Sequence, residues 1–181
     1  MSRSELWLIR HGETEWSLSG AHTGKSEVNL TLHGRQLAPR IGAYLKRTQF
    51  ALVLTSPRQR ARETCCLAGY AGAMVDEDLS EWDYGPYEGR TTDEIRKTHS
   101  NWSVWQDGVP GGETINQVAD RANRIIDRSM AADGPVALFS PGHLLRILAA
   151  CWIGLPPEAG RLFALGTGAI CTLGFRSGTR V

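Results

Sequence analysis

An arginine and a histidine stand together where a short apolar segment ends near the start of the chain. The segment Leu6–Ile9 is apolar throughout, and Arg10, His11 and Gly12 follow it directly. Such a run predicts a buried strand, and an open α/β sheet carries out its chemistry just past the carboxyl ends of strands. The forked guanidinium of Arg10 suits a phosphate group, and the imidazole of His11 can act as a nucleophile. The simpler alternative is a strand that ends in charged residues with no catalytic use.

Two arginines, Arg58 and Arg60, follow a second apolar segment. The run from Phe50 to Thr55 predicts a buried strand, after which Ser56 is a good N-cap and Pro57 a good first helical residue. A helix N-terminus favours anions, and an arginine in its first turn adds to that preference. Arg58 and Arg60 are therefore candidate phosphate contacts, unless they only form a solvated basic helix.

These groups need elements that bring them together, and the chain alternates between predicted strands and helices. A helix is expected after Thr31, with a kink or a late start at Pro39, and a loop from Glu15 to Gly24. The apolar face of that helix would carry Leu32, Leu37, Ile41, Tyr44 and Leu45. Further elements are expected at 73–75, 92–97, 114–132, 136–139, 142–153 and 169–175. This order predicts an α/β fold, a three-layer α/β/α sandwich with a mostly parallel central sheet, in a single domain over residues 1–181.

Composition narrows the class of protein. The 181 residues are 41% hydrophobic and 22% charged, which excludes a disordered chain, and the net charge of +1 argues against a nucleic-acid partner held by bulk charge. The four cysteines lie in apolar segments and are expected to be buried thiols of a reducing compartment. The longest apolar run, 144–155, is broken by Arg146 and is too short for a membrane span, and no signal peptide is expected. We therefore expect a cytoplasmic protein with no membrane partner.

Four short motifs occur in the order in which a known family carries them. They are Arg10–Thr14 (RHGET), Ser56–Ala61 (SPRQRA), Glu81–Gly85 (EWDYG) and Gly142–Arg146 (GHLLR). Together they resemble the histidine phosphatase superfamily, which includes phosphoglycerate mutases and many phosphatases, and the resemblance covers nearly the whole chain. It implies the phosphoglycerate mutase-like form of the α/β/α sandwich.

The resemblance also implies roles for individual residues. His11 would accept the phosphoryl group, Arg10 and Arg60 would bind its oxygens, and Glu81 would protonate the leaving alcohol. No metal ion and no cofactor is implied. The predicted substrate-binding residues are Ser17, Thr23, Gly24, Arg58, Tyr84 and His143.

Several stretches resemble one branch of the family, the sedoheptulose-1,7-bisphosphatase-like sugar phosphatases. They include the run from Glu15 to Gly24 and the tryptophan-containing segment before Glu113. The region 90–113 is expected to form a lid over the pocket, although its tryptophans could equally pack the loop itself. Cofactor-dependent mutases have a longer insertion here with paired arginines, which this chain lacks. The resemblance therefore favours phosphatase over mutase.

One position departs from the family pattern. Counting back from Arg146, the second histidine of the family should stand at 141, where this chain has Pro141. Proline suits a helix start but offers neither a side-chain donor nor a backbone N–H. His143 could reach the phosphoryl group instead, but lining or packing the pocket is its expected role. Three hypotheses remain: a slow enzyme, an enzyme rescued by another residue, or a phosphate-ligand binding protein without turnover.

The predicted function is hydrolysis of small phosphomonoesters, with sugar phosphates as one candidate class, through a phosphohistidine intermediate. Phosphoglycerate mutase-type transfer and a catalytically impaired binding protein are the alternatives. The partner would be a small phosphorylated metabolite, and a homodimer is left open.

Overall fold

A computed structural model describes residues 5–181, in which a five-stranded sheet separates two layers of helices. The strand order is β3-β2-β4-β1-β5, and only β5 runs antiparallel to its neighbour. The strands of this sheet are β1 (Leu6–Arg10), β2 (Leu52–Thr55), β3 (Met74–Val75), β4 (Val136–Ser140) and β5 (Ile170–Leu173). The predicted α/β/α sandwich with a mostly parallel sheet is confirmed.

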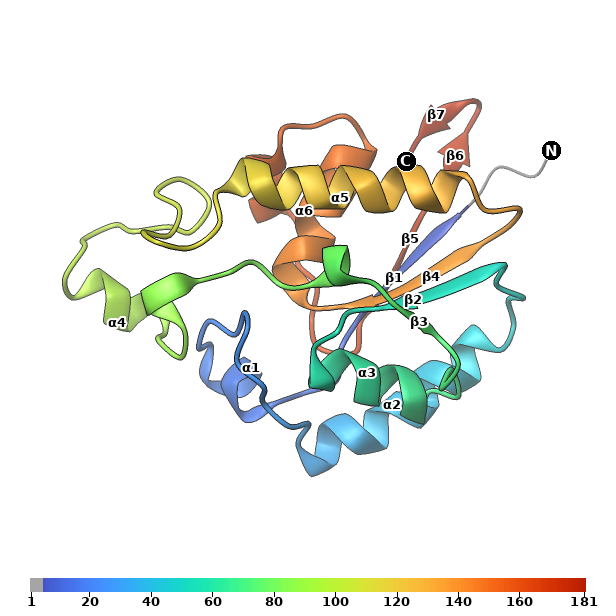
Figure 1. Cartoon of the computed structure of the whole chain (residues 1–181), viewed down its shortest axis with the longest axis horizontal. Coiled ribbons are helices and arrows are strands. Elements are labelled where there is room, and N and C mark those ends of the chain that lie inside the picture. The colour runs from blue at the N-terminus through green and yellow to red at the C-terminus, as the bar shows by residue number, and fades with distance from the viewer. Residues whose placement is uncertain (1–4) are drawn as a thin grey trace.

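Side chains of β1 and β4 alternate between two apolar clusters, as the period of a strand requires. Leu6, Leu8 and Leu138 pack against α5 (Ile115–Met130) and α6 (Gly142–Trp152). Ile9 and Phe139 pack on the other face, against α2 (Leu32–Leu45) and α3 (Gln59–Leu67). Figure 1 shows the two helix pairs on opposite sides of the sheet.

Shorter elements lie between these layers and around the ends of the strands. Two of them are short α-helices, α1 (Glu15–Ser19) and α4 (Thr92–Arg96). The 3₁₀ turns are Glu77–Leu79, Gly85–Tyr87 and Pro157–Leu162. A terminal hairpin joins β6 (Phe175–Arg176) to β7 (Thr179–Arg180). In Figure 1, α1 and α4 lie together beyond one end of the sheet, where they can enclose a site. No helix within residues 5–181 has the length and apolar character needed to cross a membrane.

Several boundaries differ from the predictions. The predicted loop after β1 contains α1, because Thr14 and Ser17 form a capping box that closes its first turn. Helix α3 starts at Gln59 rather than at Pro57, since the carboxylate of Glu27 accepts the Gln59 N–H at 2.8 Å and takes the role predicted for Ser56.

Two predictions about exposure were also wrong. Helix α2 begins at Leu32 despite Pro39, but Leu32 is 73% exposed and Tyr44 51%, because small residues form most of the face that packs inward. Of the four free thiols Cys65 is buried and Cys66 is exposed. Burial raises the pKa of Cys65 to about 12, so it is an inert core thiol.

Candidate active site

The pairing of β1 with β4 places His11 beside Pro141. Arg10 stands opposite Ser140 in this parallel ladder, so the next residue on each strand follows at the carboxyl edge of the sheet. The His11 N–H donates to the Ser140 carbonyl at 3.2 Å, and the Gly12 N–H donates to the Thr64 hydroxyl of α3 at 2.9 Å. The position of His11 is thus fixed by the neighbouring strand β4 and by helix α3.

The His11 side chain is held as a neutral nucleophile. Its Nδ1 lies 2.7 Å from the Gly12 carbonyl oxygen, and a carbonyl can only accept, so Nδ1 carries the proton and Nε2 keeps its lone pair. Burial, reinforced by the positive charges of Arg60 and Arg10, holds the pKa of His11 well below its usual 6.5, although the Gly12 bond opposes this shift. Both effects favour the neutral imidazole, with its one proton on Nδ1.

Arg10 and Arg60 lie close enough to His11 for their charges to act on it, and each has a hydrogen-bond donor left unused by residues 5–181. Arg10 Nη1 donates to the Leu165 carbonyl at 2.6 Å, and Arg60 is fully buried. In both guanidiniums the Nε–H is buried and has no hydrogen-bond partner within the described part of the chain. Burial lowers the pKa of both, with Glu81 opposing, but from a starting value of 12.5. Unpartnered buried donors on two cations are suited to an anion.

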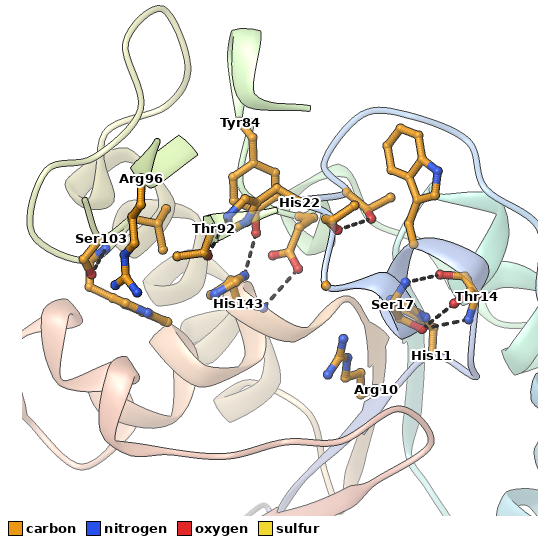
Figure 2. A pocket seen from close by; sticks show the side chains of 17 residues that line it. Arg10, His11, Thr14, Ser17, His22, Tyr84, Thr92, Arg96, Ser103 and His143 are labelled. Atoms are coloured by element: carbon orange, nitrogen blue, oxygen red, sulfur yellow. Dashed lines mark hydrogen bonds between the residues drawn. The ribbon is translucent and has the colours of Figure 1, made fainter. Parts of the chain in front are cut away.

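A cavity of about 370 Å³ opens beside His11 (Figure 2). The predicted residues that line it are Arg10, His11, Ser17, Thr23, Glu81, Tyr84 and His143. Residues of its wall that were not predicted include Thr14, Trp16, His22, Thr92, Arg96, Ser103 and Trp105. Gly24, Arg58 and Arg60 do not reach this wall.

Glu81 lies at the N-terminus of α6. Its Oε1 accepts from the backbone N–H groups of Trp82 and Leu144, at 3.0 and 2.9 Å, and its Oε2 accepts from that of His143 at 3.0 Å. A carboxylate has about four acceptor sites, so within residues 5–181 one remains free, on Oε2. The carboxyl group is thus fixed at the cavity wall and can still carry or exchange a proton.

Tyr84 and His143 form a neutral pair across the cavity. Tyr84 Oη lies 2.6 Å from His143 Nδ1. Burial raises the pKa of Tyr84 well above 10, and burial with nearby cations lowers the pKa of His143 well below 6.5. Two neutral groups that share one hydrogen bond retain one further N–H or O–H, whichever of the two donates. The pair therefore offers one donor besides the arginines.

The loop 23–26 holds Arg60, and Glu88 holds the loop. Arg60 donates to the carbonyl oxygens of Thr23 at 2.8 Å, Gly24 at 3.1 Å and Ser26 at 3.0 Å. The Glu88 carboxylate accepts from three successive backbone N–H groups, those of residues 24–26, and from the Ser26 hydroxyl. A Cβ at Gly24 would overlap the Trp82 carbonyl oxygen, so the loop packs this closely only with glycine. Gly24 thus acts on Arg60 through its backbone.

Arg58 lies on the far side of this loop. It donates to the Lys25 carbonyl at 2.9 Å and pairs with Glu27 at 3.3 Å. Together with Gly24 it lines a smaller adjoining cavity. The structure therefore does not bring either residue to the wall where the sequence prediction placed it.

The segment 90–113 both packs itself and closes the cavity. Trp102 is buried against Tyr87, with ring centroids 5.2 Å apart, whereas Trp105 faces the cavity beneath Arg146, whose guanidinium lies 4.6 Å from its ring. Each alternative for the tryptophans is thus correct for one of them.

Among the residues that the sequence analysis missed, three matter most for the site. His22 lines the cavity and immediately precedes the predicted Thr23–Gly24 pair, which was the available signal. Arg96 reaches the cavity from the end of α4, and Glu88 acts across 64 positions of sequence. No local pattern marks either of these two.

Comparison with known proteins agrees with this geometry. The family model described as histidine phosphatase superfamily (branch 1) matches residues 6–181. An acid phosphatase of Mycobacterium tuberculosis is 41% identical over 179 residues, which cover 97% of this chain and 88% of the relative. A sedoheptulose 1,7-bisphosphatase of Saccharomyces cerevisiae is 35% identical over 181 residues, which cover 82% of this chain and 67% of the relative. Among solved structures, the product of the Mycobacterium tuberculosis open reading frame Rv3214 superposes with a TM-score of 0.93 at 41% identity, covering 98% of this chain and 94% of that one.

Proposed function

Since the chain belongs to branch 1 of the histidine phosphatase superfamily and is an enzyme of phosphatase type, we propose that it hydrolyses phosphate monoesters of small metabolites through a phosphohistidine at His11. Sugar phosphates are the proposed substrate class, in line with the bisphosphatase relative. One observation carries the proposal: a buried, neutral His11 whose Nδ1–H is occupied by Gly12 lines the cavity together with Arg10, whose buried Nε–H has no partner within residues 5–181.

In the first step, Nε2 of His11 attacks the phosphorus atom. The N–P bond forms while the P–O ester bond breaks. Arg10 contacts the phosphoryl oxygens, and the buried positive charge of Arg60 stabilises them from behind the loop 23–26. The leaving alkoxide takes a proton from the Glu81 carboxyl group. In the second step a water molecule attacks phosphorus and gives its proton to Glu81. The N–P bond then breaks, inorganic phosphate leaves, and His11 is neutral again.

Pro141 bears on the rate of this reaction. Its place beside His11 in the β1–β4 register is where an imidazole could donate to the transferring group. The only observation that favours a second function, a phosphate-ligand binding protein with little turnover, is this missing donor. Arg10, His11 and Glu81 line one cavity, which supports the hydrolytic function over binding alone.

Location and assembly are proposals of the same kind. The reactant would be a small phosphorylated compound, and the described residues offer no membrane-spanning helix. The buried thiol of Cys65 fits a reducing compartment, which supports the cytoplasm as the site of action. The family match over 6–181 supports one domain, and a homodimer can be tested by light scattering.

The test is release of inorganic phosphate from a panel of sugar phosphates, with His11→Ala as the control. Release by the parent alone supports the proposal. Isomerised sugar phosphate without release would favour a mutase, and saturable binding of the panel without either product would favour a binding protein.

A further inference from the structure

The cavity has a second positive group at the end remote from His11. Figure 2 shows Arg96 and Ser103 on one side of the pocket and Arg10 and His11 on the other, with Tyr84 and His143 between them. A phosphoryl group bound at His11 would leave the rest of the substrate extending toward Arg96. The chemistry at this end therefore bears on which substrates fit.

Arg96 is oriented but not neutralised. Its Nε donates to the Trp102 carbonyl at 2.9 Å, which directs the guanidinium fork. Neither Nη atom has a hydrogen-bond partner within residues 5–181, and no carboxylate forms an ion pair with Arg96 there. By contrast, Arg58, Arg121 and Arg124 each have a carboxylate partner.

The carboxylates near Arg96 already have hydrogen-bond partners. That of Asp107 accepts the Ser103 N–H at 2.7 Å. Within the cavity wall the one carboxyl group is that of Glu81, which three backbone N–H groups already bind. Thr92 and Ser103 beside Arg96 are neutral, and Ser103 can contribute a hydroxyl. A guanidinium with two free donors pairs best with a phosphate or a carboxylate, which it can bind through two hydrogen bonds.

We propose that the substrate carries a second anionic group, a phosphate or a carboxylate, at the end remote from the scissile phosphate, and that Arg96 binds it. This inference rests on the proposed function and narrows its substrate class. Arg96 is a specificity residue here and takes no part in bond breaking, so its contribution is to substrate affinity.

Two matched substrate pairs test the proposal and separate the two anions. Fructose 1,6-bisphosphate is compared with fructose 6-phosphate, and 6-phosphogluconate with sorbitol 6-phosphate, which differs at the far end by a hydroxymethyl group in place of the carboxylate. For each pair the ratio of kcat/KM values is measured in the parent and in Arg96→Gln. Lys97→Gln is the control, because it removes the adjacent exposed charge of α4 outside the cavity.

In the parent, at least one anionic member should be preferred about tenfold or more, because the guanidinium of Arg96 would donate to a charged acceptor at an exposed site. Arg96→Gln should abolish the preference, Arg96→Lys should retain part of it, and Lys97→Gln should leave it unchanged. Which pair responds identifies the anion. Equal kcat/KM within both parent pairs, or a preference that survives Arg96→Gln, would overturn the inference.

The ratio of dissociation constants within each pair tests the same preference without turnover. Calorimetric titration of both pairs into His11→Ala, alone and combined with Arg96→Gln, should show the anionic preference only where Arg96 is present. Hydrolysis of fructose 6-phosphate without any such preference would refute the role of Arg96 and keep the phosphatase. Absence of all hydrolysis together with an Arg96-dependent binding preference would refute the phosphatase and keep the anion site.

Discussion

Replacing Pro141 by histidine should raise turnover much more than it changes substrate affinity. Pro141 is the N-cap of α6 with φ −70° and ψ 172°, a conformation that any L-residue adopts, so the backbone does not resist the change. The residue follows the Arg10–Ser140 pair in the ladder, and neighbouring strands lie about 4.8 Å apart, so the new imidazole would start one strand away from His11.

The size of the effect follows from the one donor that is gained. A donor to a developing oxyanion is worth about 3–4 kcal/mol, or 10²–10³ in rate, so kcat of Pro141→His should rise by roughly 10²-fold. KM should change much less, because the proposed ground-state contact of the phosphate is with Arg10, which the substitution leaves unchanged. The free energy of unfolding should stay within about 1 kcal/mol of the parent.

Steady-state kinetics on one phosphomonoester decide the matter, with Pro141→Ala as the matched control. The alanine variant removes the proline ring without supplying a donor, so its kcat should remain near that of the parent. An unchanged kcat in a folded Pro141→His protein would refute the reasoning. It would mean that another group already donates to the phosphoryl oxygens, and the His143–Tyr84 pair is the first candidate.

Three further predictions follow from the site. Glu81→Gln should lower kcat on sugar phosphates by about 10²-fold or more but on p-nitrophenyl phosphate, whose leaving group needs little protonation, by tenfold or less; equal losses would remove Glu81 as the general acid. Glu88→Gln should raise KM about tenfold by loosening the loop around Arg60, whereas Glu5→Gln, which removes an exposed carboxylate at the opposite end of β1 from His11, should not; equal KM values for both variants would refute this role. The free energy of unfolding should be at its full value above pH 6.5 and fall as the pH drops below it, by up to about 1.4 kcal/mol per pH unit for each buried histidine, because the unfolded chain takes up protons that the folded one does not. The histidines concerned are His11, His22 and His143, and urea unfolding at pH 7.5 and 5.5 that gives equal stability would contradict this.

The sheet and its main helices are visible in the sequence because their signals are local. β1 and β4 are short apolar runs, as buried parallel strands are, and α5 has the helical period together with the Thr114–Gln117 capping box at its start. Each of these elements packs its apolar side chains where the pattern placed them. Local pattern and tertiary packing agree there, so the prediction was correct.

The errors arose where a distant residue supplied what the local pattern lacked. Ser56 has the identity of an N-cap, but Glu27 reaches Gln59 from 32 positions away and starts α3 there. The role of Glu88 depends on a loop 62–64 positions earlier in the chain.

The candidate site shows the same limit. The positions of Arg10 and His11 follow from the end of one strand, and the register of β1 with β4 adds the position next to His11. Arg58 was grouped with Arg60 because both stand at the start of the same helix, yet the two are half a turn apart and contact opposite sides of the loop 23–26. Spacing along a helix gives the face of a side chain but not which loop packs against that face.

Trapping the phosphoenzyme tests whether His11 is the phosphoryl acceptor. The protein is incubated with a labile phosphate donor, and acid-labile, base-stable phosphate on the chain is located by mass spectrometry. The parent and His143→Ala should carry the label on His11, and His11→Ala should carry none. Label on His11→Ala at the level of the parent would contradict the mechanism proposed for this site.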